Sequence, residues 1–290
     1  MKLIKLWSFK KCKPMKKIIV AIDFSACSIH ALEYAISIAN MVKANILLVW
    51  VDSEVEHDMD FKPADIEVES RKEKSKILDE IVLKYADRLN GSLKYKFRKG
   101  RVYQEVSLMA KTEKADLIIV GTHGVSGYEE YWIGSNAYRI VTHAPCPVIT
   151  MRQQFPIRDR IEKIVIPIDG TSETLLKLDF IKNLAQTFNA EVHVVSVFPT
   201  VIEALKRKVE ENEKIAIHFL IENKINFVDQ MVKSDNLTKT IVEYATKIDA
   251  DLIGIMTEQG STKTSVFLGP NAKQLISNST IPVLNIRPQN

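Results

Sequence analysis

The chain has 290 residues, of which 46% are hydrophobic and 26% are charged, and its formal net charge is +4. This length is typical of two domains, and the composition is that of an ordinary soluble protein in which each half can bury a core. A net charge this small is not typical of a nucleic-acid-binding protein, which usually carries a concentrated basic surface. No apolar run in the sequence reaches the length of a membrane span.

The cysteines and the first residues bear on the compartment. Cys12, Cys27 and Cys146 form neither a CxxC pair nor a Cys/His spacing typical of metal sites, and such a sparse, odd set fits a reducing compartment. Lysines interrupt the apolar stretch that a signal peptide would need near the N-terminus. We therefore interpret residues 1–15 as an N-terminal extension and expect a cytoplasmic protein.

The first half of the chain predicts strands that alternate with helices. Apolar runs rich in β-branched residues indicate strands buried on both faces, and helical periodicity between them indicates helices. The predicted strands are 17–22, 46–51, 93–98, 116–120 and 147–151. The predicted helices are 25–40, capped by Ser25 or Ser28, then 64–89, 102–112 and 135–142. This order predicts an α/β fold with a doubly wound, five-stranded parallel sheet, whose ligands lie beyond the carboxyl ends of the strands.

The second half repeats the first. The segment that starts KKIIVAIDFSACS at Lys16 aligns without a gap with the segment that starts EKIVIPIDGTSET at Glu162, at a lag of 146 residues. Later segments align at a lag of 135 residues, so the second copy is shorter, in the region that matches 52–76. We infer two domains of the same fold, residues 16–153 and 161–290, joined by a linker of residues 154–160.

A glycine-rich segment follows the fourth predicted strand of the first copy. Gly121 and Gly124 would let the backbone approach an anion closely. Gly134 and Ser135 would lie at a helix N-terminus, where free N–H groups and the helix dipole favour phosphate. Glycines that only shape turns are the alternative interpretation, and no lysine or arginine lies between Gly121 and Ser135 to neutralise a phosphate.

Asp23 ends the first predicted strand, at the rim where a nucleotide would lie. Its carboxylate could accept a hydrogen bond from an adenine amino group or a ribose hydroxyl, or it could cap the following helix. Asp169 keeps the same place in the second copy, which makes the structural interpretation of this residue as strong as the binding one. Trp50 could stack on a base or belong to the core. We interpret His143 and Cys146 as part of a helix-to-strand turn, since they have no third metal ligand nearby.

Together, the strand ends VAIDFS and IPIDGT, the spacing G-x2-G-x9-G-S and the terminal HAPCPVITM resemble the universal stress protein family, over nearly the whole of both copies. The resemblance implies two tandem Rossmann-like domains of the adenine nucleotide alpha hydrolase type. Family members with this glycine spacing bind ATP, so the resemblance also implies ATP, with or without Mg²⁺, in the first domain. The residues implied to face the adenosine are Ala21, Asp23 and Trp50, and those around the phosphates are Gly121, Gly124, Gly134, Ser135 and Asn136.

The second copy lacks most of this pattern. Met256 and Gln259 replace the first two glycines, and Pro270, which has neither a hydroxyl nor an N–H group, replaces the serine. Gly269 alone is kept. We therefore expect a degenerate second site and about one nucleotide per chain.

The sequence contains no Ser–His–Asp arrangement, Walker lysine or carboxylate pair suited to acid–base work, so we expect no catalytic residues and at most slow ATP hydrolysis. It predicts a stress-response regulatory protein that binds ATP or a related adenine nucleotide and acts through a change of conformation. An unidentified signalling protein could be its partner. An interaction scaffold that binds no nucleotide and an adenylate-forming or pyrophosphatase-type enzyme are the alternatives.

In the family the final strands pair between copies, so strands 147–151 and 282–286 should pair within this chain and form an intramolecular pseudo-dimer. Two chains could still associate as a homodimer.

Overall fold

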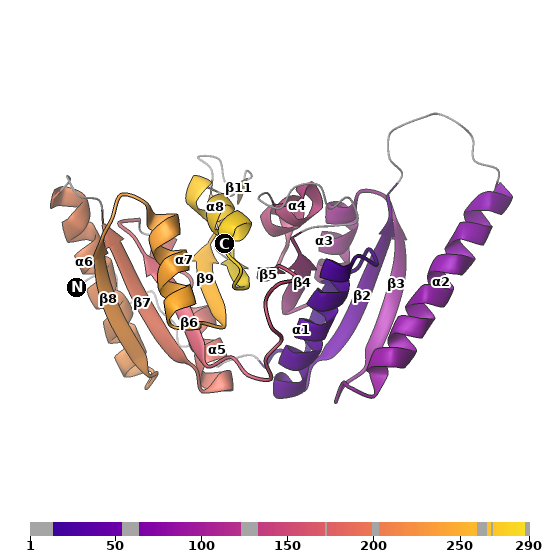
Figure 1. Ribbon diagram of the computed structural model, residues 1–290, viewed down its shortest axis with the longest axis horizontal. Coiled ribbons are helices and arrows are strands. Elements are labelled where there is room, and N and C mark those ends of the chain that lie inside the picture. Colours follow the sequence, from indigo (N-terminus) through magenta and orange to yellow (C-terminus); the bar gives the residue numbers. More distant parts are fainter. Residues whose placement is uncertain are drawn as a thin grey trace.

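The computed structural model describes residues 14–53, 64–122, 133–171, 173–198, 203–259, 266–267 and 269–287. Strands and helices alternate along both halves of the chain (Figure 1). The strands of the first half are β1 (Lys17–Ala21), β2 (Asn45–Asp52), β3 (Leu93–Lys99), β4 (Leu117–Gly121) and β5 (Val148–Met151). Its helices are α1 (Ala26–Val42), α2 (Ala64–Ala86), α3 (Val102–Thr112) and α4 (Ser135–His143).

The second half repeats this order. Its main strands are β6 (Lys163–Ile168), β7 (Glu191–Phe198), β8 (Phe227–Lys233), β9 (Leu252–Met256) and β12 (Val283–Ile286). Its helices are α5 (Leu178–Phe188), α6 (Glu203–Glu222), α7 (Leu237–Lys247) and α8 (Pro270–Asn278), with a 3₁₀ turn, η2 (Glu173–Leu175), ahead of α5. Two short strands, β10 (Glu258–Gln259) and β11 (Val266–Phe267), pair separately.

One sheet runs through the molecule, in the order β3-β2-β1-β4-β5-β12-β9-β6-β7-β8. Neighbouring strands are parallel within each half, whereas β5 and β12 are antiparallel, with Ile149 opposite Leu284. The two halves therefore meet about a pseudo-two-fold axis between β5 and β12 (Figure 1). This confirms the predicted fold class and the predicted pairing of the final strands, which covers an edge that each half would otherwise expose.

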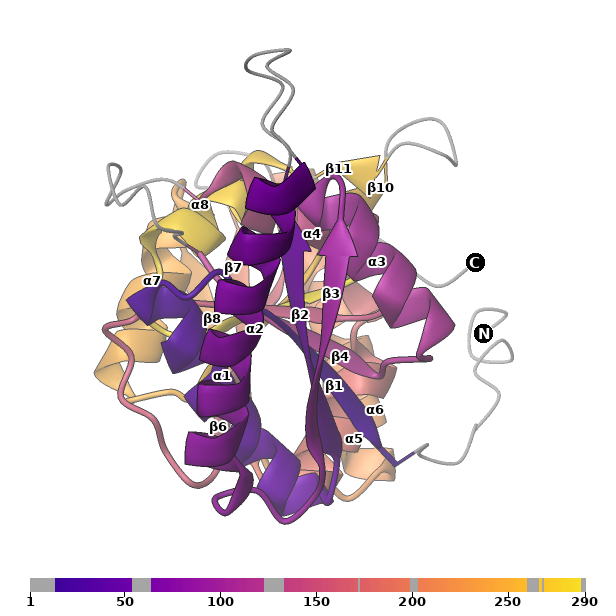
Figure 2. The same ribbon diagram turned by 90° about the vertical axis from the view of Figure 1, so that its right-hand side faces the viewer.

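Helices cover both faces of the sheet. In the first half, α1 and α2 lie on one face while α3 and α4 lie on the other (Figure 2). The central strands are apolar because both of their faces are covered: Ile18, Ile19 and Val20 of β1 are fully buried. The order of the strands reverses between β1 and β4, so this is the point at which a ligand of such a sheet is expected.

The duplication extends to single hydrogen bonds. The carboxylate of Asp116, just before β4, accepts from the backbone N–H groups of Lys16 and Lys17 at 2.8 and 3.1 Å. Asp251, just before β9, accepts in the same way from the two matching N–H groups at the start of β6, at 2.7 and 2.9 Å. In each copy a buried or half-buried carboxylate thus ties the first strand to the turn before the fourth.

The copies differ where the first helix begins. α1 begins at Ala26, whereas α5 begins only at Leu178, and the chain before it forms η2. The first turn of α1 packs against Gly121, where an added β carbon would lie 2.7 Å from the sulfur of Cys27. Met256 occupies the position of Gly121 in the second copy. The gap-free sequence alignment therefore does not carry over to the helix boundary: the helix that packs on a glycine in the first copy begins later where methionine stands.

Candidate functional site

Four of the predicted site residues gather at the switch point of the first copy. Ala21 ends β1, Asp23 follows it, and Gly121 ends the neighbouring strand β4. Trp50 lies near the carboxyl end of β2, on the other side of β1. All four therefore lie at the same edge of the sheet.

The N-terminus of α4 meets the same edge. Gly134 is the N-cap residue, and it donates its N–H group to the carbonyl oxygen of Thr122 at 2.8 Å, which ties α4 to the end of β4. Among the described residues, no side chain caps the helix. Ser135 and Asn136 are exposed in its first turn, where N–H groups have no acceptor within the helix. These two amides, rather than that of Gly134, are the donors that could meet an anion.

Neighbouring protein atoms leave little room for a side chain at Gly121 and Gly134. A β carbon at Gly121 would be 3.1 Å from the carbonyl carbon and oxygen of Cys27, besides the contact with its sulfur. A β carbon at Gly134 would be 3.0 Å from the carbonyl oxygen of Thr122. The interpretation that these glycines shape the chain therefore has a physical basis, whether or not a ligand is bound. Gly124 lies outside the described residues.

Asp23 organises the entry to α1. One oxygen of its carboxylate, Oδ1, accepts from the backbone N–H group of Ser25 at 3.0 Å and from its hydroxyl at 2.6 Å. Ser25 in turn caps α1 by accepting from the N–H group of Ser28 at 3.1 Å. Asp169 holds Thr171 in the same arrangement in the second copy, at 2.9 and 2.5 Å. A strand-end aspartate thus has a structural role in both copies, and Asp23 remains exposed at the rim.

Trp50 belongs to an aromatic cluster at this rim. Its ring is half-buried and stacks on Phe24, with centroids 6.1 Å apart and planes at 23°. Phe97 of β3 meets the indole edge-on at 5.4 Å. Phe24 itself has a positive φ of 66°, an uncommon conformation for a residue other than glycine. The cluster holds the tryptophan ring at the edge of the candidate site.

Cys27, His143 and Cys146 have structural surroundings rather than those of a metal site or a reactive thiol. Cys27 is buried, with its sulfur 3.6 Å from the carbonyl oxygen of Met151. The Nδ1 atom of His143 lies 2.9 Å from the carbonyl oxygen of Arg139, and burial raises the pKa of the Cys146 thiol to about 12. Within the described part of the chain, no group of three or more His, Cys, Asp or Glu side chains could hold a metal ion. No described helix is both long and apolar enough to cross a membrane.

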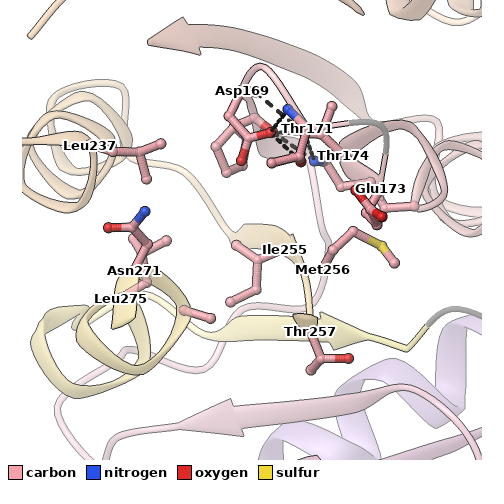
Figure 3. Close-up of a pocket in the computed structure, with 13 residues that line it drawn as sticks. Asp169, Thr171, Glu173, Thr174, Leu237, Ile255, Met256, Thr257, Asn271 and Leu275 are labelled. Atoms are coloured by element: carbon pink, nitrogen blue, oxygen red, sulfur yellow. Dashed lines mark hydrogen bonds between the residues drawn. The ribbon is translucent and has the colours of Figure 1, made fainter. Parts of the chain in front are cut away.

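The matching edge of the second copy holds a pocket of about 280 Å³ (Figure 3). It lies between the carboxyl ends of β6 and β9 and the first turn of α8. Its apolar lining includes Leu237, Ile255, Met256 and Leu275, and its polar lining includes Asp169, Thr171, Glu173, Thr174 and Asn271. The sequence predicted a degenerate nucleotide site here and gave no indication of a pocket.

Lys177 also lines this pocket, although the residue is only 2% exposed. Its ammonium group donates to the carbonyl oxygen of Pro167 at 2.6 Å and to the hydroxyl of Thr174 at 3.0 Å. Burial lowers its pKa to about 8. At the lag of the repeat, Ala31 is its counterpart in the first copy. A lysine at the position of a core alanine is the sequence signal that could have identified it.

Comparison with known proteins assigns both halves to one family. The model of the universal stress protein family matches residues 14–152 and again residues 160–287. Universal stress protein MJ0531 of Methanocaldococcus jannaschii is 29% identical over 147 residues, which are 48% of this chain and 82% of that protein. Universal stress protein YxiE of Bacillus subtilis is 29% identical over 150 residues, which are 47% of this chain and 98% of that protein. Each of these relatives thus matches about half of the chain.

A solved structure matches the whole arrangement. A universal stress protein from Archaeoglobus fulgidus superposes with a TM-score of 0.73, over 94% of this chain and 97% of its own, at 18% sequence identity. At so low an identity the likeness shows the fold alone. The two matches to the family model carry the assignment: the chain belongs to the universal stress protein family and contains two copies of the family's domain in tandem.

Proposed function

We propose that the first domain binds ATP or a related adenine nucleotide, and that the protein acts in the stress response by conformational signalling. The observation that carries the proposal is the meeting of β1, β4 and the uncapped N-terminus of α4 at the switch point of the sheet. A helix N-terminus without a side-chain cap is a favourable place for a phosphate. The carboxyl edge of a doubly wound sheet is where nucleotides of this architecture lie.

The residues present fit such a ligand. The N–H groups of Ser135 and Asn136 would face the phosphates, with the Ser135 hydroxyl as a further donor. Asp23 uses Oδ1 for Ser25, and Oδ2 has no hydrogen bond to another described residue, which leaves it to accept from an adenine amino group or a ribose hydroxyl. Ala21 and the Trp50 cluster would border the adenosine. Mg²⁺, where it accompanies the nucleotide, would offset the charge of the phosphates.

The same site argues for slow turnover. Efficient phosphoryl transfer relies on cations placed at the phosphates and on a positioned nucleophile. The sequence from Gly121 to Asn136 holds no lysine or arginine. We therefore propose a binding and signalling role, with ATP hydrolysis far below the roughly 1–100 per second of typical kinases.

A single substitution tests the phosphate site. Ser135→Pro gives α4 the residue that α8 carries at its first position, Pro270, and removes both the hydroxyl and the N–H donor. Proline is well tolerated at the first helical residue, and Gly134, with ψ at 146°, has the extended conformation that a following proline requires. We expect at least tenfold weaker ATP binding by calorimetry, with and without Mg²⁺, and unchanged thermal unfolding.

The matched control is Pro270→Ser in the second copy, which should leave ATP affinity and stoichiometry unchanged. Wild-type affinity in Ser135→Pro would remove the N-terminus of α4 from the site. Failure of the wild-type protein to bind any of ATP, ADP or AMP would favour the interaction scaffold instead.

A further inference from the structure

The second-copy pocket has the size of a site for a small molecule. Its volume of about 280 Å³ lies just below the roughly 300–1,000 Å³ of ligand pockets. Asp169 lies on one side of it, and Leu237, Asn271 and Leu275 lie on the opposite side, with Ile255 between them (Figure 3). The pocket thus combines an apolar wall with a polar one, as ligand sites commonly do.

The pocket lining carries one basic side chain, Lys177, and two acidic ones, Asp169 and Glu173. Lys177 and Asp169 both line it, and each is held by its own neighbours: Lys177 by Pro167 and Thr174, Asp169 by Thr171. The carboxylate of Asp169 favours the charged form of Lys177, yet the two side chains form no ion pair within 4.0 Å. The ammonium nitrogen of Lys177 and the carboxylate oxygens of Asp169 are therefore more than 4.0 Å apart.

The ammonium group of Lys177 has one more hydrogen-bond donor than it has acceptors among the described residues. An ammonium group has three donors, and two of them are directed at Pro167 and Thr174. Neither partner carries a charge. A cation buried without a counter-ion is costly, and an anionic group in the pocket would reduce that cost.

The described residues at the matching positions of the first copy differ. Ala31 replaces the lysine, Gly121 replaces Met256, and α1 begins at Ala26, whereas η2 precedes α5 in the second copy. The loss of the glycines in the second copy therefore coincides with the appearance of a different lining, not only with the loss of a phosphate site.

We propose that this pocket binds a small zwitterion of the apolar α-amino acid class. The ligand's carboxylate accepts a hydrogen bond from Lys177, and its ammonium group pairs with Asp169, so that the ligand bridges the two charges. Its apolar side chain packs against Leu237, Ile255 and Leu275. The inference does not depend on the nucleotide site of the first domain, because every residue it uses belongs to the second.

Three probes of similar shape test the pairing of charges on the full-length protein. L-leucine carries both charges, 4-methylpentanoate only the carboxylate, and 3-methylbutylamine only the ammonium group. By calorimetry or ligand-observed NMR, we expect L-leucine to bind at least tenfold more tightly than either single-charge analogue. Equal binding of 4-methylpentanoate and L-leucine would reduce the site to a simple anion pocket and overturn the proposal, as would binding of none of the three.

Two pairs of variants test the residues. Lys177→Met should weaken L-leucine binding at least tenfold. Lys182→Met, which removes a buried lysine of α5 that pairs with Asp179 at 3.0 Å, should not. Asp169→Asn keeps an acceptor for Thr171 but loses the charge, and it should weaken binding at least tenfold. Asp23→Asn is its counterpart in the first copy and should have no effect. Wild-type affinity for L-leucine in Lys177→Met or Asp169→Asn would refute the assignment even if the probe binds.

Discussion

Gly121 and Cys27 are in such close contact that a β carbon on the glycine would come within 2.7 Å of the cysteine sulfur. The glycine lets the first turn of α1 lie directly on the end of β4. Where Met256 takes its place in the second copy, that turn is absent and η2 is found instead. The residue at the end of the fourth strand thus differs between the two copies together with the structure that follows the first strand: an α-helical turn beside Gly121 and a 3₁₀ turn beside Met256.

Gly121→Ala should therefore destabilise the protein, by about 1–3 kcal/mol, the usual range for overpacking. Urea unfolding measures the loss. Adding Cys27→Ala should recover only part of it, since the alanine would still lie 3.1 Å from the backbone of residue 27. Gly170→Ala is the control: its β carbon would find its nearest neighbour at 3.5 Å, and we expect a change within about 0.5 kcal/mol. A Gly121→Ala protein as stable as the wild type would show that Cys27 and its backbone can move away from the added β carbon at no cost in stability.

The second copy contains a similar dependence between Gly254 and Ile181. A β carbon on Gly254 of β9 would lie 2.6 Å from Cδ1 of Ile181 in α5. Gly254→Ala should cost about 1–2 kcal/mol. Ile181→Val deletes that methyl group, so the double variant should be more stable than the sum of the two single changes predicts, by at least about 0.5 kcal/mol. Strict additivity in a double-mutant cycle would contradict the contact.

Lys177 should make stability depend on pH in the alkaline range. Burial lowers its pKa from 10.5 to about 8 in the folded state. Below pH 8 both states hold the proton, and the full cost of the buried charge is present. Between about pH 8 and 10.5 the unfolded state binds more protons than the folded state, so the free energy of unfolding rises with pH. Relative to Lys177→Met, the wild type should gain up to about 3 kcal/mol over this window.

The measurement for Lys177 is urea unfolding of wild type and Lys177→Met from pH 7 to 10.5. Other groups titrate in the same range, and the difference between the two proteins isolates this lysine. A difference that stays constant with pH would mean that Lys177 keeps an ordinary pKa.

Nucleotide should bind once per chain, in the first copy. Gly124→Val should abolish ATP binding, because a β-branched side chain would fill the space through which the phosphates approach. Gln259→Val at the matching position of the second copy should leave the affinity unchanged. Calorimetry on both variants, with circular dichroism to establish that they are folded, decides the matter. Two equivalent sites in the wild type would be the contrary result.

Much of this structure follows from local sequence. The buried runs at 17–22 and 116–120 predicted β1 and β4 because a strand covered on both faces must be apolar throughout. The repeat placed Asp169 over Asp23, and the structure gives both the same hydrogen bonds to the residue two positions later. The edge of the sheet that carries Ala21, Asp23 and Gly121 was also predictable, because the carboxyl ends of parallel strands lie together.

What the sequence could not decide depends on volumes that meet only after folding. The glycine spacing predicts room for a phosphate at Gly121, whereas the atoms nearest to its missing side chain belong to Cys27, far away in the chain. Lys177 lies just before α5, in a segment whose sequence aligns without a gap with the first copy, and its burial beside a pocket depends on Pro167, Thr174 and Met256 together. Periodicity reports which face of an element is covered, because that is a property of neighbouring residues. It does not report which distant side chain fills the space beneath, and that packing, set by the tertiary structure, distinguishes the two ligand edges of this protein.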